Sequence, residues 1–381
     1  MWPYLRDRAF RHATTAIVGT MVGVGIFGVP FAFAKAGFGI GLAWLVGIAA
    51  VVALFYLMTA ELILRTDGDR QLVGYADRWL GPWARRTVVF TSMLGIYGAL
   101  LAYTIVISQF LHNVLSHFFA LDPQMYSFLF TLALAPILML RLPTVAFIEQ
   151  ALTVLFVVIV AVVLLTGIWH IEPGNFTYVS GYFWFLPYGV LLFAFSAQTS
   201  IPIARRLLRG DEQRLAPAIL SATALTAILY AVFAAVVVGI SGTATSPDAL
   251  AGLFDTLGLP IIILGSVFGI LTISTSYLML GTALLEIYHL DYRQRLLPSW
   301  LLTVVPPLLF YVGGFRNFID VIGTVGAVAL GAQAIVFIFA YLRRDRIGDR
   351  KPELMLHLPS FVWYILIVAF AAGIGYALIW R

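Results

Sequence analysis

Two short stretches rich in glycine, small polar residues and proline interrupt long apolar runs of this 381-residue chain. Residues 19–30 read GTMVGVGIFGVP, and residues 193–202 read FAFSAQTSIP. In a helix interior glycine costs about 1 kcal/mol and proline about 3 kcal/mol, so each stretch predicts an unwound segment between two half-helices. The amides that open a half-helix favour an anion such as a carboxylate, and the carbonyls that close one favour a cation.

Glycines at the first break admit another interpretation. The spacing of Gly19 and Gly23 is typical of close helix–helix packing as well as of unwinding. The second interrupted run favours unwinding, because broken helices at matching positions in two halves of a chain indicate a binding site near the middle of a membrane.

A hydroxyl cluster occurs in the run LTISTSY. Thr272, Thr275 and Ser276 are spaced i, i+3 and i+4, so they share one face of a helix. Together with the carbonyls of Gly19 and Val22 at the first break, they would form an oxygen site for Na⁺. The alternative is that these side chains bond back to carbonyls of their own helix.

A proton is the rival to sodium as a coupling ion, and carboxylates inside a membrane are the usual carriers of protons. The candidates are few: Glu61, Glu149, Glu286 and Asp320, each close to the end of an apolar run. Arg65 follows Glu61 by four residues, so a helical ion pair is the alternative there.

The amino-acid composition indicates whether this chain folds in water or in a membrane. The chain is 61% hydrophobic and 11% charged, with a mean hydropathy of +0.97. Soluble domains are about one quarter charged, so this chain is expected in a lipid bilayer. The absence of cysteine excludes disulfides and thiolate metal sites. A net charge of +5, spread in short clusters between apolar runs, does not predict binding to nucleic acid.

Eleven segments are long and apolar enough to be candidate transmembrane helices. They lie at about 12–35, 38–64, 86–118, 124–140, 147–168, 181–207, 215–240, 258–288, 298–313, 318–342 and 359–379. With the N-terminus in the cytoplasm, all of the 23 Lys and Arg residues except Lys35, Arg316 and Arg381 fall on the cytoplasmic side. This predicts a multi-pass protein of the plasma or inner membrane with its C-terminus outside. The segment after residue 64 predicts a short amphipathic helix with Trp79 and Trp83 at the membrane interface.

The two breaks fall in the first and sixth spans. An odd number of spans separates them, so the second half is inverted in the membrane. We therefore expect an all-α integral membrane protein with a five-plus-five inverted repeat and one extra helix. The first repeat would cover residues 1–168, the second 181–342, and the additional helix 359–379.

Three stretches carry a resemblance to a known group of proteins. GTMVGVGIFGVPFAFAKAGF resembles the first-helix motif of amino acid permeases in the amino acid–polyamine–organocation superfamily. That first motif is most similar to the amino acid/auxin permease and the hydroxy/aromatic amino acid permease branches. FAFSAQTSIP and TSYLMLGTALLEIYHLD resemble the sixth and eighth spans of the aromatic permeases. Gln198 stands where the aromatic permeases often have histidine.

The resemblance implies a secondary active transporter that carries a neutral amino acid, with aromatic amino acids among the candidates, together with Na⁺ or H⁺, and that needs no cofactor. The substrate carboxylate would bind amides of Gly23, Val24 and Gly25. Its ammonium group would bind oxygens of Met21, Phe193, Ala194 and Ser196. Tyr97 and Tyr103 are candidates for the side-chain pocket, with Ser274 and Gln333 as weaker ones. The alternative is an amino-acid sensor similar to germinant-receptor subunits, which would bind without coupled uptake.

Overall fold

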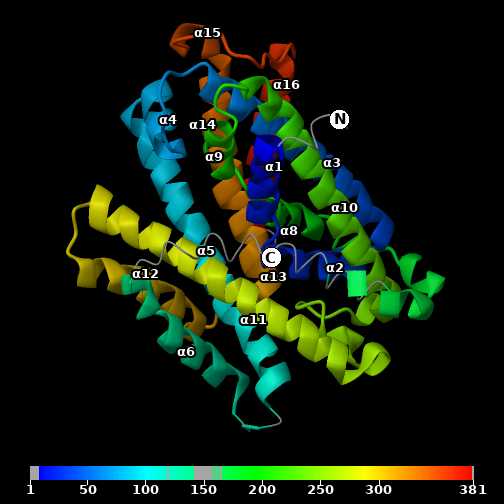
Figure 1. Ribbon diagram of the computed structural model, residues 1–381. Coiled ribbons are helices and arrows are strands. Elements are labelled where there is room, and N and C mark those ends of the chain that lie inside the picture. Colours follow the sequence, from blue (N-terminus) through cyan, green and yellow to red (C-terminus); the bar gives the residue numbers. More distant parts are fainter. Residues whose placement is uncertain are drawn as a thin grey trace.

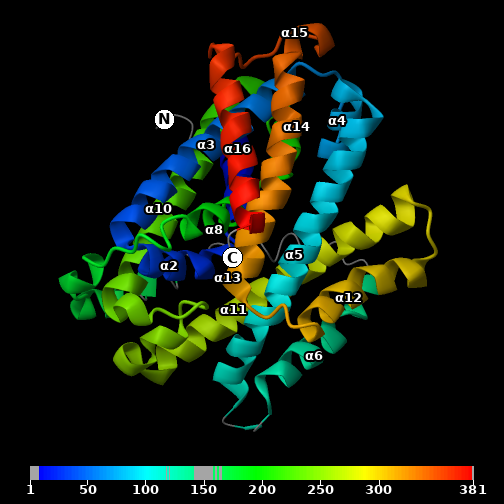
Figure 2. The same ribbon diagram turned by 180° about the vertical axis from the view of Figure 1, so that it is seen from behind.

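The computed structural model describes residues 8–116, 118, 119, 121–140, 158, 161, 162 and 165–379. These residues form helices and no strands (Figures 1 and 2). Six described helices are long and apolar enough to cross a membrane: α3 (Phe38–Leu64), α5 (Pro82–Leu115), α10 (Leu215–Ser241), α11 (Phe254–Glu286), the unit from α13 (Phe318–Val325) to α14 (Gly331–Leu342), and α16 (Ser360–Ile379). The bent pair of α1 (Arg8–Met21) and α2 (Gly25–Ala36) is counted as a seventh span.

Most predicted spans agree with the observed helices. The helix α3 has the predicted bounds, and α10 and α16 differ from theirs by one residue. The helix α6 (Pro123–Leu134) is shorter than the predicted span 124–140, whereas α12 (Leu296–Val312) is shifted slightly from the predicted span 298–313 and is not shorter. Most of the predicted span 147–168 lies outside the described residues, so the number of eleven spans stays a prediction.

Both predicted interruptions are present. The axis turns by 59° between α1 and α2. In the sixth predicted span, α8 (Leu186–Ala194) stops and α9 (Ser200–Leu207) starts after an unwound segment. A π-helical turn at Gly326–Leu330 also separates α13 from α14. The first and sixth predicted spans are therefore interrupted at the stretches rich in glycine, small polar residues and proline.

The halves of the broken helices pack against each other in the middle of the bundle. The half-helix α2 contacts α8, and α8 in turn contacts α13. Around them α3 packs on α10, while α5 packs on α11, α12 and α13. Figure 1 shows α2, α8 and α13 close to the centre of the molecule, between the longer helices.

One end of the molecule holds α4 (Leu72–Leu80), the short α15 (Arg344–Ile347) and the start of α1 (top of Figure 1). The short amphipathic helix is confirmed as α4, but the expectation for Trp79 was wrong. Trp79 is 5% exposed, stacks on Tyr75 and donates from Nε1 to the Thr66 hydroxyl at 2.9 Å. Its indole hydrogen bond is satisfied inside the protein, so the side chain does not need the interface. Trp83 is 49% exposed.

Candidate functional site

The first break exposes backbone groups that a continuous helix would use. The amide of Gly23 bonds to the Met21 carbonyl at 3.0 Å, which ends the regular pattern of α1. In α2 the Ile26 amide bonds to the Gly23 carbonyl at 3.3 Å. The first amides of a helix have no acceptor within it, and those of Val24 and Gly25 have no bonding partner in the described contacts. These amides are free for an anionic ligand.

The glycines of this break have different surroundings. A Cβ atom at Gly23 would meet no other atom within 4 Å, whereas one at Gly25 would lie 2.8 Å from the Ala194 Cα. Gly23 is therefore the open position, and Gly25 is required for the contact between α2 and the end of α8. The packing interpretation of the Gly19 and Gly23 spacing is wrong for Gly23, and the glycine that packs closely is Gly25.

The second break is held by a tyrosine from α3. The Tyr56 hydroxyl donates to the Phe195 carbonyl at 2.6 Å and accepts from the Ala197 amide at 2.6 Å. The side chain of Tyr56 is fully buried. A single side chain thus satisfies two backbone groups that the interruption of α8 leaves without helical partners.

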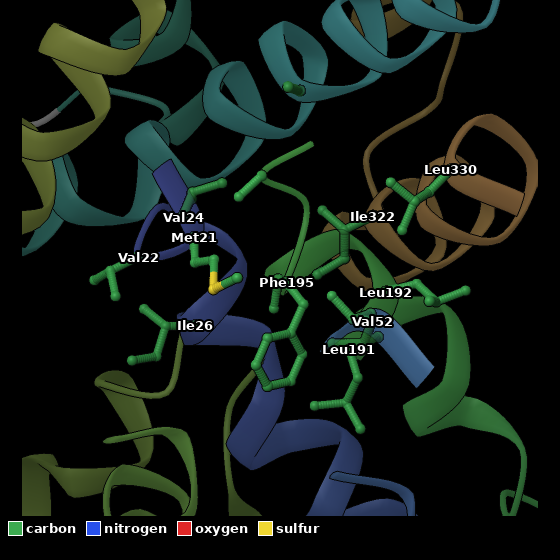
Figure 3. Close-up of a cluster of buried hydrophobic side chains, with 14 of the residues drawn as sticks. Met21, Val22, Val24, Ile26, Val52, Leu191, Leu192, Phe195, Ile322 and Leu330 are labelled. Carbon is green, nitrogen blue, oxygen red and sulfur yellow. The ribbon is translucent and has the colours of Figure 1, made fainter. Parts of the chain in front are cut away.

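A second tyrosine joins the two breaks to each other. The Tyr230 hydroxyl, from α10, lies 2.8 Å from the Met21 carbonyl oxygen and 2.8 Å from that of Ala194. These oxygens belong to the last residues of α1 and α8, and both were predicted to bind an ammonium group. The structure brings them to one point. Figure 3 shows Met21 and Phe195 beside apolar side chains of the surrounding helices.

Tyr56 and Tyr230 are not among the residues predicted from the sequence. Each is an isolated phenol in the middle of an apolar span, in VVALFYLMT and TAILYAVFA. A buried Tyr hydroxyl generally finds a hydrogen-bond partner. A mid-span tyrosine was therefore a signal for an irregular backbone nearby.

Other predicted substrate residues are distributed unevenly. Tyr103 is buried on α5 and Phe193 is half-buried, while Ser196 is exposed in the second break. The Tyr97 hydroxyl is already engaged, at 2.7 Å from the Tyr288 hydroxyl and 2.6 Å from the Leu302 carbonyl. The weaker candidates, Ser274 and Gln333, lie on α11 and α14, and the Ser274 hydroxyl donates to its own helix at Ile270. The hydrogen bonds of Tyr97 and Ser274 therefore do not connect these two side chains to either break.

The predicted sodium ligands on α11 are all buried. Thr275 donates to the Thr272 carbonyl at 3.0 Å, as the alternative interpretation expects. The Thr272 hydroxyl is buried without a hydrogen-bond partner in the described structure, so its oxygen remains available as a ligand. The described contacts do not join Thr272, Thr275 or Ser276 to the carbonyls of Gly19 and Val22.

The predicted proton carriers differ in burial. Glu61 is 1% exposed; it lies 2.8 Å from Arg65 and accepts from the Tyr341 hydroxyl at 2.6 Å. The helical ion pair is therefore present. Glu286 and Asp320 are exposed at helix ends, and Glu149 lies outside the described residues.

Comparison with known proteins identifies the family of this chain. Residues 7–379 match the tryptophan/tyrosine permease family. The chain belongs to this family. The permease is 25% identical over 334 residues to the tyrosine-specific transport system 1 of Haemophilus influenzae. The aligned residues are 82% of the permease and 83% of that relative.

Two solved transporters share its fold. MhsT in complex with L-phenylalanine matches with a TM-score of 0.64 at 14% identity, over 97% of the permease and 99% of MhsT. Mhp1, a nucleobase-cation-symport-1 family transporter, closed with bromovinylhydantoin bound, matches with a TM-score of 0.66 at 13% identity, over 96% and 90%. The permease therefore has the LeuT-type fold with two broken helices. It is a multi-pass membrane transporter of an amino acid permease family, not an enzyme.

Proposed function

We propose that the permease is a symporter that carries a neutral aromatic amino acid with Na⁺ or H⁺ by alternating access between the two sides of the membrane. The proposal depends mainly on the contact between Gly25 and Ala194. This contact places the amide end of α2 beside the carbonyl end of α8. Opposite partial charges at two adjacent helix ends suit the opposite charges of an amino acid.

In this proposal the substrate carboxylate binds at the free amides of Val24 and Gly25; the Gly23 amide, which was predicted for the same role, is bonded to the Met21 carbonyl at 3.0 Å. The open space at Gly23 supports this, because a ligand can approach the backbone there. The ammonium group binds at the Met21 and Ala194 carbonyls. The tyrosine-specific relative and the phenylalanine bound to MhsT support an aromatic substrate, and the superfamily suggested by the sequence motifs is compatible with both.

The unpartnered Thr272 hydroxyl supports sodium as the coupling ion. Glu61 is a weaker carrier of protons in this structure, because its oxygens are held by Arg65, Tyr341 and the Leu356 amide. We place the protein in the cell membrane with the N-terminus in the cytoplasm, because its basic residues gather on that side of the predicted spans.

Uptake into proteoliposomes tests the proposal. Labelled tyrosine, tryptophan and phenylalanine are each offered with an inward sodium gradient at matched pH, with an inward proton gradient without sodium, and with neither. Accumulation above equilibrium under one gradient is the expected result, and the gradient identifies the ion. Binding without uptake under any gradient would contradict symport and favour the sensor. Absence of both binding and uptake for all three amino acids would contradict the proposed substrate class.

A further inference from the structure

Tyr230 stands at the point where the carbonyl ends of both broken helices meet. Its side chain is 0% exposed, and its ring packs on Phe195 with centroids 5.2 Å apart. The ring position is therefore fixed by packing. Rotation about the bond between the ring and the hydroxyl oxygen is the remaining freedom that decides where the proton points.

The hydroxyl has too few protons for its surroundings. A tyrosine hydroxyl donates one hydrogen bond and can accept others, yet two carbonyl oxygens lie at 2.8 Å from it. At any moment one of them faces a lone pair of the phenol oxygen. Both carbonyls also belong to helix C-terminal ends, which carry negative partial charge. The Met21 carbonyl also accepts from the Gly23 amide at 3.0 Å, so three buried oxygens share two protons.

A primary ammonium group supplies what this arrangement lacks. It has one positive charge and three N–H donors, as the lysine ammonium does. Hydrogen bonds to a charged group are also stronger than neutral ones. The acceptors would be the Met21 carbonyl, the Ala194 carbonyl and the hydroxyl oxygen of Tyr230 after it rotates its proton away.

We propose that Tyr230 is a specificity-determining residue that completes a three-oxygen site for the primary ammonium group of the substrate. The proposal rests on the proposed function and extends it. The two broken helices provide two backbone carbonyls as acceptors. The third acceptor is a side-chain hydroxyl that comes from a different helix, α10. The permease would therefore select free amino acids over ligands that lack the amino group or carry methyl groups on it.

The test measures binding to the purified permease in lipid nanodiscs, at fixed pH and salt. The ligands are L-tyrosine and 3-(4-hydroxyphenyl)propionate, which lacks the amino group. In Tyr230→Phe the affinity for L-tyrosine should fall about tenfold, which corresponds to about 1.4 kcal/mol. The affinity for the propionate should stay unchanged, so the ratio of the two affinities falls by the same factor.

The matched control is Tyr56→Phe, which removes another buried hydroxyl near the breaks but not one that faces Met21 or Ala194. It should leave the ratio unchanged even if it lowers the melting temperature. An unchanged ratio in Tyr230→Phe, or an equal loss for both ligands, would show a purely structural role and overturn the inference.

A measurement on the unaltered permease covers the case in which Tyr230→Phe does not fold. N-methyl-L-tyrosine and N,N-dimethyl-L-tyrosine remove one and two N–H donors, so affinity should fall at each step. Equal affinities for all three ligands would overturn the inference while leaving the proposed function intact. Failure of the unaltered permease to bind any amino acid would instead reject the proposed function, and the ammonium site with it.

Discussion

At the first break two glycines separated by a single residue have different tasks. Gly25 allows α2 to touch α8, because a methyl group there would lie 2.8 Å from a backbone atom. Gly23 keeps the backbone open, since nothing lies within 4 Å of a Cβ atom at that position. Because both residues are glycine, the sequence does not show that one packs closely and the other faces open space.

Alanine at each position separates packing from binding. Gly25→Ala should lower the free energy of unfolding by about 1–3 kcal/mol, because overpacking forces the helices apart. Gly23→Ala should change stability by less than about 1 kcal/mol but weaken L-tyrosine binding, because the methyl group enters the space beside the free amides. Thermal melting and equilibrium binding of both variants check this. Loss of stability in Gly23→Ala with normal binding would contradict the assignment.

Thr272 tests the sodium site at the same scale. Its hydroxyl makes no hydrogen bond in the described structure, so Thr272→Val should not destabilise the sodium-free protein. Under the proposed coupling to sodium, the variant should lose both a sodium-induced increase in melting temperature and the sodium dependence of uptake. Thr226→Val is the matched control, because Thr226 is a second buried threonine whose hydroxyl has no partner. A sodium response that survives in Thr272→Val would place the ion elsewhere.

At the scale of elements, the segment between α10 and α11 contains an acid that the sequence analysis did not select. Asp248 is 4% exposed; its Oδ1 accepts from the Ala251 amide at 3.4 Å, and its Oδ2 has no partner in the described structure. The next residue, Ala249, has a φ of 61°.

Burial raises the pKa of Asp248, and hydrogen bonds from Ser246 and nearby amides oppose the rise only in part. The buried form of the loop therefore holds a proton more tightly than an open form would. Closure is favoured at low pH and weakens as the pH rises through the raised pKa. An ionised carboxylate without a partner is costly to bury, so the loop should open more often at higher pH.

The chain contains no cysteine, so single cysteines report on this loop directly. A thiol-reactive, membrane-impermeant label should modify the buried position in Ala249→Cys faster as the pH rises, after division by the rate for exposed Thr243→Cys. In the background of Asp248→Asn, which mimics the protonated form, the corrected rate should stay low at every pH. Equal pH profiles in both backgrounds would exclude control by Asp248.

At the scale of the whole molecule, a buried arginine fastens α9 to the segment that joins α3 and α4. Arg205 is 7% exposed and donates to the Ile63 carbonyl at 3.0 Å, the Thr66 carbonyl at 3.3 Å and the Tyr75 hydroxyl at 3.1 Å. Its neighbour Arg209, which is mostly exposed, pairs with Asp69. These contacts hold one half of a broken helix at the end of the molecule that carries α4 and α15.

The alternating access that we propose requires such contacts to release, so Arg205 should control the population of closed states at this end. Arg205→Lys keeps the charge but loses the planar set of donors. We expect faster labelling of a cysteine at the buried Ala204 and lower uptake, with both effects at least several-fold. Arg209→Gln is the control and should change either rate by less than about twofold, because exposed pairs contribute little. Equal effects of the two variants would refute a special role for Arg205.

The sequence by itself determined the membrane environment, most helix bounds and the positions of both breaks. It did so because long apolar runs need a bilayer, and because glycine and proline weaken a helix wherever they occur. It also predicted the ion pair of Glu61 with Arg65, since i, i+4 spacing depends only on the helix. These properties are local, so they can be predicted from the sequence without knowing which helices pack against each other.

Only the tertiary structure decided which groups share a point in space. It joined Met21, Ala194 and Tyr230 from three helices far apart in the chain. It also separated the tasks of Gly23 and Gly25 and buried Trp79 and Asp248. The physical reason is that hydrogen-bond partners and burial depend on contacts between helices, and hydrophobic periodicity leaves those contacts undefined in a chain that is apolar on nearly every face.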